Sequence, residues 1–299
     1  MSRAKSRSAR RKGWRTAANS DRYDLYEQAV QGCESDCALF DRVYEQWTGR
    51  LPRSLREDFC GTALLCREWV QWRKGNSGVG VDFDPEALAR ARTSLLALPA
   101  RQRARVTLIQ GDVNHTVSEP ADLLVALNFS YFVLHTRRQL RDYFVKAFSH
   151  VRPGGLAFFD AYGGSGSWSV GEEERSLDGF VYVWHQARVN PINHHVVNHI
   201  HFRFPDGSEM RRAFTYRWRL WTVPEIVEVL TEAGFVRPTV LWEGTDRKTG
   251  EGNGVFKPTT RGEACEGWIV YVAAQRPRTA ARGTAARASP RLGRDRRAS

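Results

Sequence analysis

Short apolar runs alternate with helical patterns from residue 54 to residue 160, and this alternation leaves few folds open to the chain. Two parallel strands need a crossover of a dozen or more residues, which each intervening helix can supply. The alternation therefore predicts an α/β domain whose parallel sheet is covered by helices on both faces. Strands are predicted at residues 54–59, 78–81, 106–109, 123–127 and 156–160, and helices at residues 23–30, 38–47, 64–72, 85–98 and 139–150.

The pattern changes after the fifth predicted strand. Residues 179–220 alternate in hydrophobicity with a period of two, and turn signals at Asn190-Pro191 and Pro205-Asp206-Gly207 separate the runs. This pattern predicts an antiparallel, β-rich insert from about residue 165 to residue 220 that can fold over the sheet as a lid.

A last helix and two strands follow the insert. Thr222 and Glu225 have the spacing of a capping box, which predicts a helix over residues 225–233 that Gly234 ends. Two more strands are predicted at residues 239–242 and 268–273.

The formal net charge of +12 is concentrated at the two ends of the chain. Residues 1–15 hold seven Lys and Arg and no acid, and residues 276–299 hold eight Arg and one Asp; the ends thus carry +14, which leaves −2 for residues 16–275. A nearly neutral body indicates no basic nucleic-acid-binding face. The polar composition of residues 1–18 and 277–299 predicts disorder, and we expect these ends to make only non-specific contacts with polyanions.

The folded domain is thus expected to span residues 19–276, outside a membrane. No run of about 18 apolar residues predicts a transmembrane helix, and the N-terminus lacks the apolar segment of a signal peptide. The five cysteines are an odd and sparse set, which argues against a disulfide scaffold and favours a reducing, cytoplasmic setting. No feature of the sequence indicates an oligomeric state.

Acidic residues stand at or just after the ends of the first three predicted strands. Glu57 lies near the end of the first, Asp82 follows the second, and Asp112 comes just beyond the third. Parallel strands end at one edge of a sheet, where α/β folds bind ligands in a crevice. Asp82 stands 21 residues after Gly61, which is the spacing of a carboxylate that binds ribose hydroxyls. Together the three acids predict a nucleotide-type site.

Several motifs, in this order, resemble those of class I S-adenosylmethionine-dependent methyltransferases. The resemblance extends over roughly residues 20–275 and implies a Rossmann-like, doubly wound, seven-stranded and mostly parallel sheet with an antiparallel insert after strand five. The motifs are Leu55-Arg56-Glu57-Asp58-Phe59-Cys60-Gly61-Thr62-Ala63, Val79-Gly80-Val81-Asp82-Phe83-Asp84-Pro85, Gln110-Gly111-Asp112-Val113, Val151-Arg152-Pro153-Gly154-Gly155 and the late helix from Trp221 to Phe235.

The resemblance implies a role in binding S-adenosyl-L-methionine for each matching position. Glu57 would bind the amino group of the methionine moiety, and Asp82 would bind the ribose hydroxyls. Asn128, after the fourth strand, would lie near the sulfonium and the acceptor. Contacts with the methionine moiety would come from Cys60, Gly61 and Thr62, and contacts with the adenine from Phe83, Asp112 and Val113.

The glycine motif departs from the family pattern. The family has Gly-x-Gly-x-Gly where this chain has Phe59, Gly61 and Ala63, so the larger residues narrow the loop and are expected to shift the cofactor or weaken its binding.

Methyl transfer from a sulfonium requires alignment and exclusion of water more than acid–base groups. Tyr131 and His135, which follow Asn128, are candidates to orient or deprotonate a nucleophile, although packing explains each more readily.

The predicted insert is rich in histidines and aromatic residues. His195, His199 and His201 would share one face of a strand, next to His194, but no Cys or acid cluster accompanies them, so we expect no metal. The aromatic residues of the insert suit a lid over a planar or cationic small molecule, and they are Tyr182, Trp184, Phe202, Tyr216, Trp218 and Trp221.

The sequence therefore predicts an S-adenosylmethionine-dependent methyltransferase (EC 2.1.1.-) that acts on an O- or N-nucleophile of a small molecule. One alternative is a methyltransferase that holds RNA or protein with its basic ends. Two others are a nicotinamide-dependent oxidoreductase, which shares the acid after the glycine turn, and a binding module that does not catalyse a reaction.

Overall fold

The fold is built around a single large sheet. The structure, a computed structural model, describes residues 15–246, 248 and 252–278. The sheet has the strand order β11-β10-β12-β5-β4-β1-β2-β3, with β1 to β5 parallel and β10, β11 and β12 antiparallel to their neighbours. Its strands are β1 (Ser54–Asp58), β2 (Ser77–Asp82), β3 (Val106–Gln110), β4 (Ala121–Ala126), β5 (Val151–Gly163), β10 (Val236–Thr245), β11 (Gly252–Pro258) and β12 (Trp268–Gln275).

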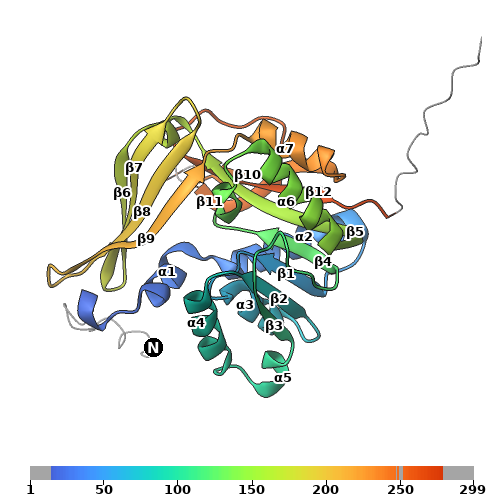
Figure 1. Ribbon diagram of the computed structural model, residues 1–299, viewed down its shortest axis with the longest axis horizontal. Helices are drawn as coiled ribbons and strands as arrows, with labels where there is room; N and C mark the ends of the chain where they lie inside the picture. The colour runs from blue at the N-terminus through green and yellow to red at the C-terminus, as the bar shows by residue number, and fades with distance from the viewer. Residues whose placement is uncertain (1–14, 247, 249–251, 279–299) are drawn as a thin grey trace, which may run out of the picture.

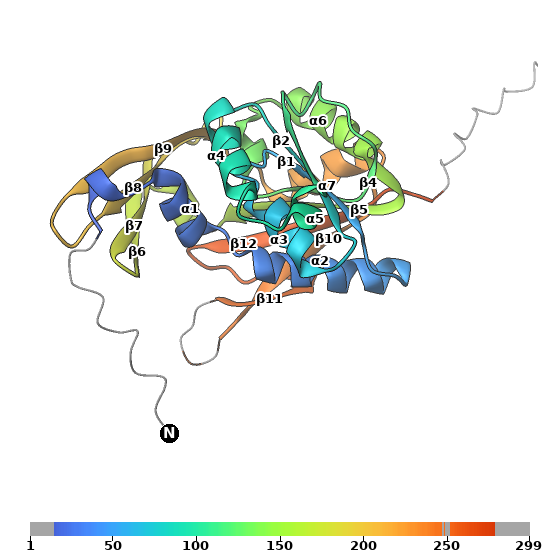
Figure 2. The ribbon, with the colours of Figure 1, turned by 90° about the horizontal axis from the view of Figure 1, so that it is seen from below.

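Helices cover both faces of this sheet, as the alternation predicted (Figures 1 and 2). Leu123 and Val125 of β4 pack into a core with α2, α3 and α4, whereas Leu124 and Ala126 pack into a core with α6 and α7. All side chains of β4 are buried, as expected for a central parallel strand. The helices are α1 (Arg22–Val30), α2 (Cys33–Thr48), α3 (Leu64–Trp72), α4 (Pro85–Leu95), α5 (Ala100–Arg103), α6 (Arg137–His150) and α7 (Val223–Glu232).

The mostly parallel α/β fold with an antiparallel insert is confirmed, with one correction to the strand number. The large sheet has eight strands and not seven, because β11 pairs with the outer side of β10. Residues of β11 are mostly polar or glycine and are exposed, so this edge strand lacks the apolar run on which the prediction relied. None of the described helices is long and apolar enough to cross a membrane.

A second, four-stranded antiparallel sheet forms the insert, and we call it the lid sheet. Its strands are β6 (Gly171–Leu177), β7 (Phe180–Asn190), β8 (His195–Arg203) and β9 (Glu209–Arg219), in that order. It lies beside the large sheet, next to α1 (Figure 1). The sequence missed β6, whose side chains are nearly all exposed and polar, so no alternation marks it.

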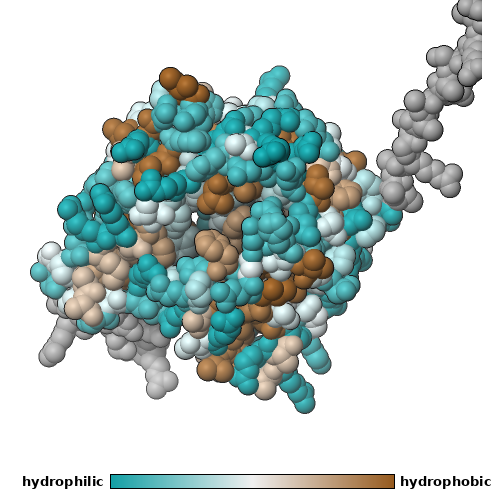
Figure 3. All heavy atoms as spheres, in the orientation of Figure 1, coloured by the Kyte–Doolittle hydropathy of each residue, from teal (hydrophilic) through white to brown (hydrophobic). Residues whose placement is uncertain are grey.

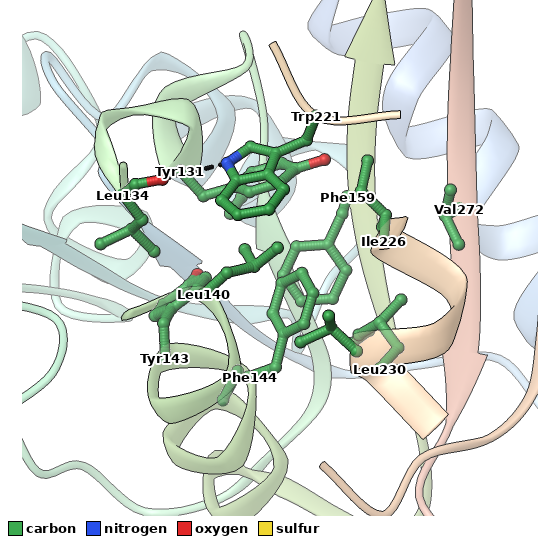
Figure 4. Close-up of a cluster of buried hydrophobic side chains, with 14 of the residues drawn as sticks. Tyr131, Leu134, Leu140, Tyr143, Phe144, Phe159, Trp221, Ile226, Leu230 and Val272 are labelled. Atoms are coloured by element: carbon green, nitrogen blue, oxygen red, sulfur yellow. Dashed lines mark hydrogen bonds between the residues drawn. The ribbon is translucent and has the colours of Figure 1, made fainter. Parts of the chain in front are cut away.

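The end of the lid sheet that returns to the body is fastened to the β4–α6 connection. The Trp221 indole N–H donates to the Leu134 carbonyl at 3.0 Å (Figure 4), and the Arg219 guanidinium donates to the His135 carbonyl at 3.4 Å. Within the lid sheet, Leu220 N–H donates to the His194 carbonyl at 2.9 Å. The predicted capping box then begins α7, because the Thr222 hydroxyl accepts from the Glu225 N–H and the Glu225 carboxylate accepts from the Thr222 N–H.

The described structure begins a few residues before the expected N-terminal boundary at residue 19. Residues 1–14 lie outside the described residues, but Thr16 caps a 3₁₀ turn at Ala17–Asn19, and Ala17 N–H donates to the Ser208 hydroxyl of the lid sheet at 2.9 Å. Of the C-terminal segment predicted to be disordered, residues 277–299, residues 279–299 lie outside the described residues, whereas Pro277 and Arg278 are described.

Candidate active site

The loop between β1 and α3 takes the path that a glycine motif would take. Phe59, Gly61 and Ala63 all have positive φ angles, of 59°, 53° and 52°. Such left-handed conformations favour glycine and cost other residues about 1–2 kcal/mol each. The departure from Gly-x-Gly-x-Gly therefore leaves the backbone path in place and adds strain, with the Phe59 ring packed 5.5 Å from that of Tyr143.

Asp82 and Gly61 are brought into direct contact, although they lie 21 residues apart. The Gly61 N–H donates to Asp82 Oδ2 at 2.7 Å, and the Asp84 N–H donates to Oδ1 at 2.9 Å. Cys60 lies beneath this contact, with its N–H bonded to the Val81 carbonyl and its sulfur against Gly80. The loop and the end of β2 thus form one rigid edge.

Glu57 lies on the floor of this edge with an unused oxygen. The side chain is 4% exposed, and its Oε2 has no hydrogen-bond partner among the described residues. Burial raises the pKa of Glu57 to about 8. The hydroxyl of Thr62 is likewise buried and unpaired. Buried polar atoms without partners fit a bound polar group, in particular a cation beside the carboxylate.

The third acid also lies at the carboxyl edge, in a more open position. Asp112 has a 53% exposed side chain, whose Oδ1 accepts from the backbone and side-chain N–H groups of Asn114. Its neighbour Val113 is buried in the core, while Phe83 is 73% exposed on the same edge. The structure therefore brings together Glu57, Asp82 and Asp112 at successive strand ends.

Asn128 follows β4 in a left-handed turn that an unpredicted acid holds. Asn128 and Phe129 have φ angles of 55° and 56°, and their N–H groups donate to the two carboxylate oxygens of Asp160, at 2.6 and 2.9 Å. Burial raises the pKa of Asp160 to about 8. Asp160 ends the strand predicted at 156–160, so its position as a fourth acid at a strand end could have identified it.

A second unpredicted feature lies on the opposite face of β1. Asp58 is buried beside the Arg56 guanidinium at 2.8 Å and accepts from the Tyr143 hydroxyl at 3.2 Å. Because successive side chains of a strand point to opposite faces, Glu57 and Asp58 lie on opposite sides of the sheet and contact different residues. Sequence alone does not distinguish the two adjacent acids.

Tyr131 is a core residue. It is fully buried among aromatic rings (Figure 4). Its hydroxyl donates to the Asp160 carbonyl at 2.8 Å. Burial raises its pKa well above the usual value, which opposes a role as a base. Trp221, expected in the lid, also lies in this core. Both Tyr131 and Trp221 are therefore packed in the core, as the alternative to a catalytic or lid role predicted.

His135 lies at the base of the lid sheet. Its Nε2 is 2.9 Å from the Arg217 carbonyl, which can only accept, so Nε2 carries the proton. Its ring lies 4.6 Å from that of His195, and both line a pocket of about 260 Å³. His135 is therefore a hydrogen-bond donor at this nitrogen and has no lone pair there to take up a proton.

One group in the lid sheet has the spacing of metal ligands. Ligand atoms of Glu172, His185 and His201 lie within 4.8 Å of one another. The backbone N–H of Arg212 donates to His201 Nδ1 at 3.0 Å, which places the proton of a neutral His201 on Nε2. That proton points toward His185 Nδ1 at 3.3 Å, so a hydrogen bond between the two rings explains their contact. Of the other histidines noted in the sequence, His199 contacts the Thr215 hydroxyl at 2.9 Å.

The strand order, the glycine-type loop and the acids at the carboxyl edge define a doubly wound protein with a nucleotide-type cofactor site. Residues 60–157 match a family model described as "Methyltransferase domain". The fold is also that of solved S-adenosylmethionine-dependent methyltransferases, which supports S-adenosyl-L-methionine as the cofactor. The domain match and the fold together support S-adenosylmethionine-dependent methyl transfer.

Solved structures with this fold cover nearly the whole chain. CalS10, an amino pentose methyltransferase from Micromonospora echinaspora, is 16% identical with a TM-score of 0.60, over 86% of this chain and 97% of its own. KedS8, a sugar N-methyltransferase from Streptoalloteichus sp., is 19% identical with a TM-score of 0.59, over 85% and 92%. The CcbJ methyltransferase from Streptomyces caelestis is 16% identical with a TM-score of 0.61, over 85% and 95%. At these identities the likeness is one of fold. No curated protein matches the sequence.

Proposed function

We propose that the chain methylates an amine or hydroxyl of a small molecule. The observation that carries this proposal is the aromatic face of the lid sheet, which packs directly against the carboxyl edge: the Trp218 ring lies 6.1 Å from that of Phe129, the residue after Asn128. A wall this close to the loop encloses a compact acceptor and leaves little room for a polymer. The solved sugar and amino pentose methyltransferases of the same fold support the choice of a small acceptor.

In this proposal the acids hold the cofactor. The unpaired Glu57 oxygen receives the ammonium of the methionine moiety, beside Gly61 and Thr62, with Cys60 beneath. Each carboxylate oxygen of Asp82 accepts one backbone N–H, from Gly61 or from Asp84, and can accept one more hydrogen bond. Asp82 uses these remaining positions to bind the ribose hydroxyls. Around the adenine stand Phe83, Asp112 and Val113.

The remaining residues align the reaction and keep water out. When bound, the cofactor supplies a methyl group on a positively charged sulfur, which is already a good leaving group. Asp160 fixes the backbone of Asn128 and Phe129 beside the acceptor through two hydrogen bonds. The aromatic rings of the lid sheet exclude water, which is the main contribution that such a displacement needs.

Phe83→Ala is expected to separate cofactor binding from folding. Because the ring is mostly exposed, its removal leaves the free energy of unfolding unchanged within about 0.5 kcal/mol. Loss of stacking on the adenine raises the dissociation constant for S-adenosylmethionine about tenfold. Calorimetric titration and urea denaturation measure the two effects, and unchanged affinity would remove Phe83 from the site.

Removal of residues 1–14 and 279–299 tests the alternative acceptors, RNA or protein. These ends carry a net charge of +11 out of the formal +12 of the chain, so the binding of a polymer held by them would depend on salt. We expect unchanged turnover of small-molecule acceptors and no salt-sensitive methylation of RNA by the full chain. If methylation of RNA or protein falls severalfold on truncation, the result would favour a polymer as the acceptor.

Identification of the acceptor tests the proposal itself. The protein is incubated with labelled S-adenosylmethionine and a small-molecule extract, and labelled products are analysed by mass spectrometry. A labelled low-molecular-weight product is expected. Labelled macromolecules alone would overturn the small-molecule assignment, and cofactor binding without any labelled product would indicate a binding module. The methyltransferase family match favours the present class over a nicotinamide-dependent enzyme.

A further inference from the structure

One face of the lid sheet turns toward the carboxyl edge of the large sheet, and we call it the inner face. Rings of Trp184 and Trp218 on this face lie 6.4 and 6.3 Å from that of Tyr162, at the end of β5. Tyr216 stacks on Trp218 at 4.5 Å from the same face. In the space-filling view, apolar residues gather in the middle of the molecule, where the lid sheet adjoins the body (Figure 3).

Asn198 is a buried amide in the middle of the inner face. It is in register with Tyr216 of β9 and Gln186 of β7 and has no exposed surface. Its Nδ2 donates to the Tyr162 hydroxyl at 3.3 Å, but its Oδ1 has no partner among the described residues. An unsatisfied buried acceptor is unfavourable and rare in folded proteins, so a ligand N–H or O–H is the natural partner for Oδ1.

Asn198 faces the same space as the proposed methyl donor. Tyr162, its partner, lies two residues after Asp160, and its ring lies 4.7 Å from that of Phe129. Tyr26 of α1 packs against the inner face from another side, because its ring lies 5.0 Å from that of Phe214. The carboxyl edge, α1 and the inner face thus surround one site.

Around Asn198 and Tyr216 the described residues of the inner face carry no charge; Arg175 of β6, whose guanidinium lies 5.4 Å from the Tyr182 ring, stands at the outer edge of this face. The polar atoms around Asn198 and Tyr216 are an amide oxygen and tyrosine hydroxyls, set among the faces of tryptophan and tyrosine rings. Aromatic faces bind the apolar surface of saturated rings and attract cations, while the oxygens accept from hydroxyl and amine groups. An acceptor with a phosphate or carboxylate beside Asn198 and Tyr216 would bury a charge without a partner.

We propose that the inner face binds the acceptor and that the acceptor is a polyhydroxylated ring amine of the amino sugar class. Asn198 Oδ1 accepts a hydrogen bond from an N–H of the nucleophilic amine and so directs the nitrogen lone pair toward the methyl group. The neutral amine forms the new C–N bond as the C–S bond breaks; the sulfur keeps that electron pair and becomes a neutral thioether, and the positive charge passes to the methylated ammonium. This inference rests on the proposed methyl transfer.

Asn198→Ala and Gln186→Ala form a matched pair for the test. Both residues are buried amides on neighbouring strands, but the Gln186 amide group already donates to the Ser167 and Ser169 carbonyls at 2.8 and 2.6 Å. Asn198→Ala is expected to raise KM for an amino sugar at least tenfold with unchanged affinity for S-adenosylmethionine. Gln186→Ala is expected to lower the melting temperature and leave that KM within twofold. Asn198→Asp, which keeps an acceptor oxygen, is expected to recover most of the KM.

The probes are labelled S-adenosylmethionine with glucosamine, glucose and glucosamine 6-phosphate, together with other free amino sugars. We expect transfer to the free amino sugars, none to glucose, and poor use of the phosphate. Transfer to none of the amino sugars, or an unchanged KM in Asn198→Ala, overturns the inference. Failure of the proposed function gives a different result. In that case the unsubstituted protein would not bind S-adenosylmethionine, or would transfer a methyl group to no compound of an extract.

Discussion

Asp82→Ala is expected to weaken binding of S-adenosylmethionine about a thousandfold. The carboxylate is placed to accept hydrogen bonds from both ribose hydroxyls, and each charge-assisted bond contributes about 1.5–3 kcal/mol. The substitution also frees the Gly61 N–H, which donates to Asp82 at 2.7 Å and holds the loop against β2. A combined loss of about 4 kcal/mol corresponds to the expected change in the dissociation constant, which calorimetric titration measures.

Asp84→Asn is the matched control for this experiment. It removes the same charge two residues away, and asparagine still caps α4 as Asp84 does through the Glu86 N–H at 2.9 Å. We expect its dissociation constant to stay within threefold of the unsubstituted protein. Comparable losses in both variants would mean that net charge, and not ribose recognition, controls the affinity.

Glu57→Gln is expected to reduce affinity about a hundredfold at pH 8 and to abolish its dependence on pH. Without cofactor, burial raises the pKa of Glu57 to about 8, so the carboxyl group is mostly protonated at pH 7. A neighbouring ammonium favours the ionised form and lowers that pKa, so binding below pH 8 releases a proton. Affinity of the unsubstituted protein should therefore rise by up to tenfold per unit from pH 6 to pH 8, and then level off.

Titrations in two buffers of different ionisation enthalpy measure this proton release directly. The unsubstituted protein should release between about half and one proton per cofactor at pH 7, and Glu57→Gln close to none. Glu45→Gln, an exposed position on α2, should behave like the unsubstituted protein. Release that persists in Glu57→Gln would assign the proton to another group and remove Glu57 from the ammonium site.

Much of the fold follows from patterns that the sequence displays locally. The uninterrupted apolar run of β4 and the capping box at Thr222 are local signals, and both predicted the observed elements. β6 and β11 are polar edge strands, and their pairing depends on neighbours that are distant in sequence. Local reasoning therefore finds the centre of each sheet more readily than its edges.

The sequence predicted those residues of the candidate site that lie at the ends of parallel strands. Glu57, Asp82 and Asp112 meet at one edge because parallel strands end there. The contribution of Asp160 was missed because it acts on the backbone of Asn128 from another strand. The placement of Tyr131 in the core depends on the direction of one short 3₁₀ turn after β4, which no periodicity encodes.

The hydrogen bond from Trp221 to the Leu134 carbonyl, which fastens the lid sheet to the β4–α6 connection, has a mechanical consequence. The far end of the lid sheet, near Ser208, packs instead on α1, where Leu25 and Ala29 join Phe202 in a small separate core. That end can therefore move away from the body only together with α1. Passage of reactants into and out of the enclosed space should then occur on the α1 side, past the Ala17–Ser208 contact, while the clamped end keeps the aromatic wall in register with the Asn128 turn.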